Sequence, residues 1–535
     1  MLSLILILGG FSIEILPFGQ PIAAADLPNI LWISCEDISP NLGCYGDQYA
    51  KTPNLDALAS EGVRFDRAFT HSGVCAVLRS GVITGVYPIS IGSQHMRSRI
   101  VTPSNIKCFT EYLRAKGYYC TNRSKTDYQF EPPTTAWDRQ GTQHGDWRGR
   151  GQKQPFFSVI NLTVCHESQI RHSEKRHQQI LNKLKPEQIH DPEKAGSFLP
   201  PYIPNTPEAR KNWAWYQDNI SEMDRQAGNI LQKLEDDGLS DNTLVVFWSD
   251  HGQGMPRGKR WIYDSGTHVP VIMRWPEKLA AGKSREDLVS LIDLTATTLS
   301  VAGISPPEYM HGRILIGNEQ EQEPEFIFFH RDRMDEAYEL QRGARGQKFR
   351  YIRNFEPEKT YAQGIDYMDE MPAMKVWRRL NAQKKLSPPQ TNWFAKSKPI
   401  EELYDCDIDP HNIQNLAADS RFSSQLKKFR TATENWQLRI GDLGMVPEPV
   451  LMETINSMKV TVVAPKIKIE NGHLLLTCET DGASLTFRTK RSGRWSGWRL
   501  YPYRSQIESS MEQIEAKACR IGCGESKSVI LDLQD

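Results

Sequence analysis

Three apolar runs constrain the fold of this chain more than any other feature of its sequence. Residues 29–35 (NILWISC), 156–162 (FFSVINL) and 243–249 (TLVVFWS) are nearly continuous in apolar character. Strands that are covered on both faces have this pattern, whereas strands with one wet face alternate. The runs therefore predict buried, neighbouring strands of a parallel sheet.

Polar side chains follow each of these predicted strands. Glu36 and Asp37 come directly after the first, His166 comes shortly after the second, and Asp250 and His251 come directly after the third. In parallel sheets of α/β proteins, ligands bind beyond the carboxyl ends of the strands. We therefore expect these five side chains to lie in one functional site.

Helical patterns separate the strands. Thr52 and Pro53 mark the start of one helix and Gly62 its end. A longer helix is predicted from about residue 208 to 238, where apolar residues recur at three and four residues: Trp213, Tyr216, Ile220, Met223, Ala227, Leu231 and Leu234. This alternation predicts an α/β sandwich around a large, mostly parallel central sheet.

The carboxyl-terminal part has a different texture. After about Pro449 come short strand-like segments (VTVVAP, HLLLTCE, SLTFRTK, SVILDL) with turn residues such as Asn471 and Gly472 between them, which predicts a small all-β appendage. Residues 356–398 are polar and weakly periodic, so surface loops or an insertion are expected there. A chain of 535 residues also exceeds one typical core.

These observations predict four segments. Residues 1–25 form a signal peptide, 26–350 a large α/β domain, 351–450 a smaller α+β subdomain that holds the insertion, and 451–535 a β-rich domain. The signal peptide is indicated by the apolar stretch LSLILILGG and by Ala23 to Ala25 before Asp26. We therefore expect a periplasmic or secreted protein.

Charge and hydropathy exclude two classes of partner. Lys plus Arg and Asp plus Glu number 65 each, without long runs of either sign, so no global field attracts nucleic acid or an anionic membrane. No later segment reaches the length of a bilayer span. Any anion that this protein handles is expected to bind at a local site.

The acidic residues at the strand ends indicate a metal site. Glu36, Asp37 and Asp250 offer hard oxygen ligands of the kind that Ca²⁺ and Mg²⁺ prefer. His251 is a less usual ligand for such a cation. A single acidic pair could equally be a helix cap or a solvated loop, but two pairs after two buried strands favour the metal.

Cys75 opens a predicted helix in the run CAVLRSGVITG. A helix N-terminus favours negative charge, which can be a thiolate or a bound anion. Arg79 lies one turn further on the same face, where it can make charge-assisted hydrogen bonds. An isolated cysteine is more often a small buried apolar residue, and the arginine alone does not decide between the two.

The motifs, taken in order, resemble the sulfatase family. The resemblance is carried by PNILWISCEDISPNLGCYGD, TPNLDALASEGVRFDRAF, CAVLRSGVITGVYPISIGSQHMRS, SDHGQGMPRGKRWIYDSGTHVPVIMRWP and EELYDCDIDPHNIQNLA, and spans about residues 28–445. In detail it is most similar to the branch that includes heparan N-sulfatases. It implies an alkaline-phosphatase-like fold and hydrolysis of sulfate esters or sulfamates on a sulfated glycan.

The resemblance also implies residue roles. Glu36, Asp37, Asp250 and His251 take the positions that bind one Ca²⁺, with Mg²⁺ less favoured. Cys75 takes the position that sulfatases oxidise to formylglycine (3-oxoalanine), which requires a formylglycine-generating enzyme as a maturation partner. The remaining implied roles belong to Arg79, which holds the aldehyde hydrate, Lys125 and Lys259, which contact sulfate oxygens, and His166, which protonates the departing sugar oxygen.

Four further residues are expected to line the sugar pocket. They are His95 and Arg97 from GSQHMRS, and Arg331 and Asp332 from HRDRMDE. For the neighbouring residues of HRDRMDE, a buried salt-bridge network that supports the subdomain contact is an equal alternative.

The family pattern is broken at two positions. The maturation motif usually reads Cys-x-Pro-x-Arg, or has Ala for Pro, whereas this chain has Val77; Asp127 stands where many sulfatases have histidine. Two alternatives to an active sulfatase therefore stay open. With an unconverted Cys75 the protein becomes a silent binder of sulfated glycans, and with a Cys75 thiolate it becomes a phosphate-ester hydrolase of the same superfamily.

Overall fold

The structure is a computed structural model that describes residues 27–141, 145–502 and 505–533. The predicted signal peptide, residues 1–25, lies outside these ranges. No helix in the described ranges is long and apolar enough to cross a bilayer. All ten cysteines are described, and each is a free thiol.

A central sheet of eight strands forms the core of the described chain, in the order β5-β4-β6-β1-β7-β8-β2-β9. Five of its seven pairings are parallel, which confirms the mostly parallel sheet. The strands are β1 (Asn29–Cys35), β2 (Val63–Phe65), β4 (Tyr119–Arg123), β5 (Arg139–Gln140), β6 (Phe156–Leu162), β7 (Thr243–Ser249), β8 (Val271–Arg274) and β9 (Lys283–Arg285).

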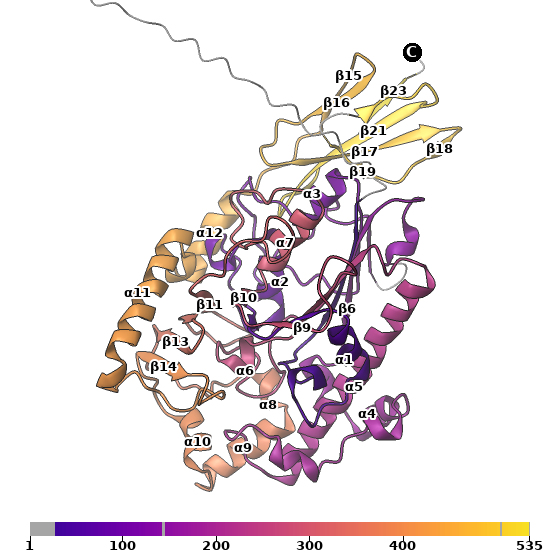
Figure 1. The fold of residues 1–535 in the computed structure, drawn as a ribbon. Coiled ribbons are helices and arrows are strands. Elements are labelled where there is room, and N and C mark those ends of the chain that lie inside the picture. The colour runs from indigo at the N-terminus through magenta and orange to yellow at the C-terminus, as the bar shows by residue number, and fades with distance from the viewer. Residues whose placement is uncertain (1–26, 142–144, 503–504, 534–535) are drawn as a thin grey trace, which may run out of the picture.

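Helices cover both faces of this sheet (Figure 1). Because side chains alternate along a strand, Leu31 and Ile33 of β1 pack on one face with α1 (Pro53–Ser60) and α5 (Pro207–Asp236). Ile30 and Trp32 pack on the other, with α2 (Cys75–Thr84), α3 (Phe109–Ala115) and α7 (Asp293–Val301). The predicted sandwich and both predicted helices are confirmed. Shorter elements of this domain are α4 (Glu174–Leu181), α6 (Asp264–Thr267), β3 (Ala68–Phe69) and β10 (Val289–Ser290).

A second, antiparallel sheet builds the smaller subdomain. It consists of β11 (Ile327–Arg331), β12 (Gln341–Arg345), β13 (Phe349–Asn354) and β14 (Glu401–Asp405), and α11 (Ser423–Ile440) packs against it. The sheet begins at Ile327, so the division expected between residues 350 and 351 falls inside β13. The strand β11 thereby brings Arg331 into the subdomain.

The expectation of surface loops at 356–398 is wrong. This segment contains α8 (Asp366–Asp369), α9 (Pro372–Ala382) and α10 (Pro388–Thr391). Met374 and Trp377 are fully buried and Trp393 is 2% exposed, in the same core as α5. The apolar stripe of α9 covers few turns among many polar residues, which hides its periodicity.

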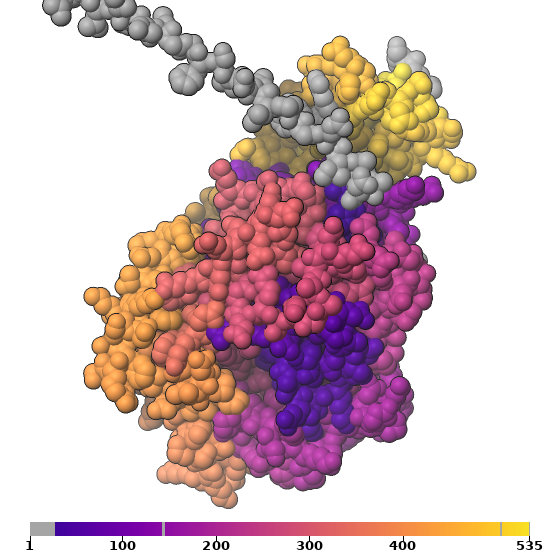
Figure 2. All heavy atoms as spheres, viewed as in Figure 1, coloured from indigo at the N-terminus to yellow at the C-terminus, as the bar shows by residue number. Residues whose placement is uncertain are grey.

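The C-terminal β domain, residues 466–533, follows α12 (Glu448–Ser457) at one end of the molecule, as Figure 2 shows in yellow. The segment 460–465, expected as a strand, is not one. Asn471 and Gly472 form the predicted hairpin turn, both with positive φ. The strands are β15 (Lys466–Glu470), β16 (His473–Thr477), β17 (Ser484–Arg491), β18 (Arg494–Trp495), β19 (Arg499–Leu500), β20 (Ser505–Gln506), β21 (Gln513–Arg520), β22 (Gly524–Glu525) and β23 (Val529–Asp532).

Candidate active site

The parallel pairing of β1 with β7 places the candidate site. Cys35 and Ser249, the last residues of these strands, are in register, so the residues that follow them meet at one edge of the sheet. The Asp37 backbone N–H donates to Asp250 Oδ1 (3.0 Å), and Asp37 has a φ of 54°, in the left-handed region that aspartate tolerates better than most residues. The strand ends thus hold two carboxylates together.

The four expected metal ligands do converge. Donor atoms of Asp37, Asp250, His251 and Cys75 all lie within 4.8 Å of one another, and Glu36 belongs to an overlapping group with Asp37, Cys75 and His166. Glu36 also forms ion pairs with Arg79 (3.0 Å) and Lys125 (2.8 Å). The fold therefore brings together predicted ligands that are far apart in the chain.

Two buried carboxylate oxygens provide a test of whether a cation fits here. Asp37 and Asp250 are fully buried, and within the described chain Asp37 Oδ1 and Asp250 Oδ2 accept no hydrogen bond. Their nearest cationic atoms are His251 Nε2, 3.1 Å from Asp37 Oδ1, and Arg79 Nη2, 3.6 Å from Asp250 Oδ2. Both oxygens are therefore only partly compensated, and burying them in that state is costly. A hard divalent cation between them would satisfy both, so these residues fit a Ca²⁺ site.

Cys75 lies at the centre of this cluster. It is the first residue of α2, is 3% exposed, and its Sγ is 3.4 Å from His251 Nε2 and 3.6 Å from Lys259 Nζ. Burial raises the pKa of the thiol, but the positive charges of Lys125, Lys259 and His251 outweigh burial and hold the pKa well below its ordinary value. The position therefore favours a negatively charged group.

Arg79 is held by a residue that the sequence reasoning did not select. Asn161, near the end of β6, accepts a hydrogen bond from Arg79 Nη1 (2.7 Å) and another from Ser34 Oγ (2.6 Å). Its amide nitrogen donates to Asn122 Oδ1 (2.8 Å). The sequence indicates the role of Asn161 only by placing a polar residue inside a strand that is predicted to be buried.

Lys259 and His166 complete the site from two other loops. Lys259 Nζ is 2.7 Å from Asp37 Oδ2 and 3.4 Å from His166 Nε2. The Nδ1 atom of His166 lies 2.9 Å from Ser168 Oγ. Burial and Lys259 lower the pKa of His166, but Asp37 and Cys75 raise it more, so the net pKa lies above its ordinary value.

A buried ion pair between Arg260 and Glu167, which the sequence did not predict, fixes the loop that carries Lys259. The next residue, Arg260, forms two hydrogen bonds with Glu167 (3.0 and 2.9 Å) and one with Asp335 (2.6 Å). Such bidentate contacts are strong and directional. They tie the loop after β7 to the loop after β6, and thereby place Lys259 beside His166.

The four residues expected in the sugar pocket make no direct polar contact with this cluster in the described ranges, although Met96, between His95 and Arg97, packs with Val74 and Val77 beside Cys75. No hydrogen bond or ion pair between described residues joins His95, Arg97, Arg331 or Asp332 to it. His95 is buried 3.8 Å from Glu448, and Arg97 is exposed.

The other two residues of this set, Asp332 and Arg331, differ in whether a side chain of opposite charge contacts them. Asp332 is buried and bound to Arg342 (3.0 Å) and His330 (3.0 Å), as in a structural network. Arg331 has no carboxylate within 4 Å in the described ranges, and burial lowers its pKa to about 10.

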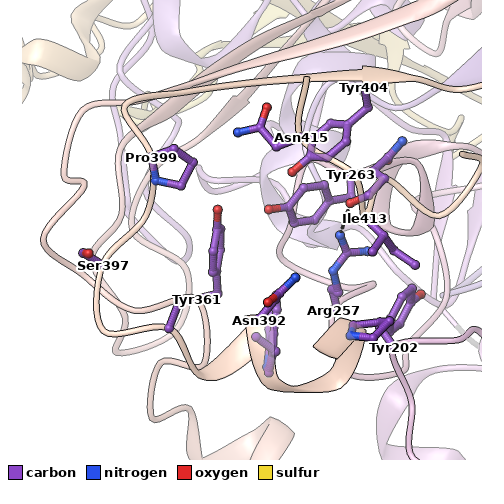
Figure 3. Close-up of a pocket in the computed structure, with 14 residues that line it drawn as sticks. Tyr202, Arg257, Tyr263, Tyr361, Asn392, Ser397, Pro399, Tyr404, Ile413 and Asn415 are labelled. Atoms are coloured by element: carbon purple, nitrogen blue, oxygen red, sulfur yellow. Dashed lines mark hydrogen bonds between the residues drawn. The ribbon is translucent and has the colours of Figure 1, made fainter. Parts of the chain in front are cut away.

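A separate cavity of about 230 Å³ lies between the catalytic domain and the subdomain (Figure 3). None of the Cys75 cluster lines it. The hydroxyls of Tyr263, Tyr361 and Tyr404 all donate to the buried carboxylate of Glu402, and Arg257 packs over Tyr202 and Tyr263. Because these polar groups already bond to partners within the protein, we assign the cavity to the packing between the two domains and not to the active site.

Comparisons with known proteins agree on one family. The family described as Sulfatase matches residues 28–304, and the family described as N-sulphoglucosamine sulphohydrolase, C-terminal, matches residues 255–373. An ulvan-active sulfatase of Formosa agariphila is 38% identical and is aligned over 95% of this chain and 92% of its own length. Human N-sulphoglucosamine sulphohydrolase is 25% identical over 80% of this chain and 93% of its own.

Solved structures share the fold. The phosphonate monoester hydrolase of Agrobacterium radiobacter superposes with a TM-score of 0.56 at 19% identity, over 77% of this chain and 96% of that protein. The fold is alkaline-phosphatase-like, as expected. Because one fold hosts several ester hydrolases, the fold alone does not select the ester that is cleaved.

Chelation tests the metal site. Exhaustive chelation is expected to lower the melting temperature, because it leaves Asp37 and Asp250 buried beside each other without a cation. Adding back Ca²⁺ should restore the melting temperature more effectively than Mg²⁺. An Asp250→Asn variant serves as the control, since it should respond much less to either treatment. An unchanged melting temperature, with no stoichiometric ion by elemental analysis, would contradict the assignment.

Proposed function

Because this chain belongs to the sulfatase family, we propose that it hydrolyses sulfate esters or sulfamates on a sulfated glycan, and that Cys75 matures to formylglycine. The observation that carries this proposal is the position of Cys75. It lies at a helix N-terminus, between two lysines and two histidines, beside two buried carboxylate oxygens that lack hydrogen bonds. A glycan substrate is supported by the ulvan-active relative.

Two groups that this chain would bind or acquire supply part of the chemistry. Formylglycine, in its hydrated form, supplies a hydroxyl nucleophile for the sulfur atom. Calcium, held by Glu36, Asp37, Asp250 and His251, supplies positive charge against the sulfate oxygens. We propose maturation by a formylglycine-generating enzyme and export to the periplasm or medium.

The cations of the chain itself bind the sulfate. Lys259 and Lys125 both act on the space around Cys75, one from the loop after β7 and one from the segment after β4. Their ammonium groups donate to oxygens on which negative charge grows in the transition state. Arg79 is held by Asn161 and Glu36, so its guanidinium orients residue 75 without having to reorganise.

His166 is the general acid of this proposal. Its raised pKa favours the protonated form that a general acid needs, and the Ser168 contact at Nδ1 leaves Nε2 directed at the site. A sugar alkoxide is a poor leaving group, so a proton delivered to its oxygen accelerates cleavage. Lys259, whose ammonium lies 3.4 Å from the same nitrogen, lowers the pKa of His166 and so favours release of this proton to the leaving group.

A phosphate-ester hydrolase is the second candidate function. One observation favours it: the lowered pKa of the Cys75 thiol, which supports a thiolate nucleophile without maturation. A sulfated-glycan binder is the outcome if position 75 keeps its thiol and neither ester is cleaved.

Substitution of His166 tests the general acid. His166→Ala is expected to lower kcat on a sulfated sugar by about 10²- to 10⁴-fold. It should scarcely affect an aryl sulfate whose phenolate leaves without protonation. The control is Ser168→Ala, which keeps the imidazole and should give a smaller loss with the same preference for the sugar. Equal losses on both substrates would show that His166 does not donate the proton.

Position 77 tests maturation. Val77 is the third residue of α2, packed with Val74, Met96 and Met334, and the first helical hydrogen bond runs from Leu78 N to Val74 O. Proline at 77 therefore removes no intrahelical bond. In a host with formylglycine-generating enzyme, Val77→Pro is expected to raise the sulfatase activity per molecule.

The matched controls are Val77→Ala, which restores the other residue common in the motif and should also gain activity, and Val77→Leu, which should not. Melting temperatures report whether each variant folds. Equal specific activity in the parent and in a fully folded Val77→Pro variant would show that valine does not limit maturation.

A further inference from the structure

A groove lies between the C-terminal β domain and the edge of the central sheet, and Cys75 is not among the residues that line it. It consists of two adjoining cavities of about 450 and 560 Å³ that share Tyr119, Asp138 and Trp498 among their lining residues. The β domain lines it with residues of β17, β18, β19 and β21, and the catalytic domain with residues of β4, β5 and nearby loops. Figure 1 shows β17, β18 and β19 at the end of the molecule near α3. Both volumes are in the usual range for ligand sites, about 300 to 1,000 Å³. We call this feature the basic groove.

Positive charge is concentrated in the basic groove although the whole chain is neutral. Among the described residues, its lining includes one carboxylate, Asp138, and six basic side chains: Arg114, Arg139, Arg491, Arg494, Arg499 and Lys517.

Half of these basic side chains have a carboxylate partner. Arg491 pairs with Glu508, Lys517 with Glu525, and Arg114 with Asp138. No carboxylate in the described ranges lies within 4 Å of Arg139, Arg494 or Arg499. Arg139 bonds to the Tyr119 hydroxyl and Arg499 lies 4.7 Å from the Phe487 ring centroid, but neither contact neutralises a charge. Three guanidinium charges therefore remain for an external anion, and guanidinium matches planar or tetrahedral oxyanions well.

Aromatic rings alternate with these cations. Trp495 and Trp498 line the basic groove, and Arg488 lies over both rings, at 4.7 and 4.9 Å from their centroids. Lys517 lies 4.7 Å from the ring of Trp498. These cations cover part of the tryptophan rings, and the ring surface that stays exposed can pack against the apolar face of a sugar.

The two walls of the basic groove are joined firmly. Arg114 on α3 bonds to Asp138 and to the carbonyl of Trp498 (3.3 Å). Lys107 donates to the Gly482 carbonyl (2.8 Å), and Ile521 of the β domain belongs to the main hydrophobic core. A ligand would therefore meet a preformed site, which lowers the entropic cost of binding.

We propose that the basic groove binds a sulfated polysaccharide chain at a second site, distinct from the site around Cys75. The cations would bind sulfate groups and the tryptophans the sugar rings. The identity of the anion rests on the proposed function, whereas the anion-binding character rests on the groove itself. Tyr119 begins β4 and Lys125 follows its end, so the two sites lie at opposite ends of a strand about 15 Å long. One long glycan could occupy both and raise the local substrate concentration.

The test measures binding of ulvan and of chemically desulfated ulvan in a Cys75→Ala background, where turnover does not consume the probe. The groove variant Arg139→Gln/Arg494→Gln/Arg499→Gln should bind ulvan about tenfold more weakly or worse. The matched control Lys459→Gln/Lys468→Gln/Lys527→Gln removes three exposed charges outside the groove and should bind as the parent does. Trp495→Ala should weaken binding further than Trp495→Phe.

Each outcome decides between the possible partners. Equal losses in groove and control variants would mean unspecific attraction and would overturn the proposal, as would unchanged binding in the groove variant. Equally tight, groove-dependent binding of polyuridylate would assign the groove to polyanions in general. Because no turnover is measured, a failed sulfatase assay leaves this test intact, and loss of groove binding leaves the sulfatase proposal standing.

Discussion

The site depends on how the protein neutralises the negative charge of two carboxylates that the sheet brings together. The register of β1 and β7 brings Asp37 and Asp250 into contact range, and both are fully buried. Ionised carboxylates in such surroundings need cations or hydrogen bonds. Lys259 meets one oxygen of Asp37, whereas two other oxygens of the pair have no hydrogen bond in the described chain. The divalent cation that we propose here would complete this compensation and leave Lys125, Lys259 and Arg79 with charge to offer an anion.

Positioning of these cations comes from polar residues below the surface. Asn161 connects Arg79 to β4 and β1, and the Glu167–Arg260 pair connects the loops after β6 and β7. Each of these contacts is buried, so it loses little to solvent and restricts side-chain motion. The cluster around Cys75 is therefore organised before any substrate arrives, which is what electrostatic stabilisation of a transition state requires.

The sequence predicted the elements that repeat a simple pattern. The three apolar runs became β1, β6 and β7, the long amphipathic stripe became α5, and Cys75 opens α2. It did not predict α9, whose stripe is short and diluted by polar residues, or Asn161 and Glu167, whose roles depend on partners more than 80 residues away. Contacts across the fold, not local spacing, decide such roles.

Formylglycine at position 75 is the central claim, and the mass of the peptide that contains this residue tests it most directly. The protein would be expressed with increasing amounts of formylglycine-generating enzyme, and the peptide mass and the rate of sulfate release measured for each preparation. The account predicts an aldehyde in place of the thiol, in a fraction that rises in proportion to sulfatase activity. A preparation that releases sulfate at full rate while every copy of the peptide keeps its thiol would contradict the account.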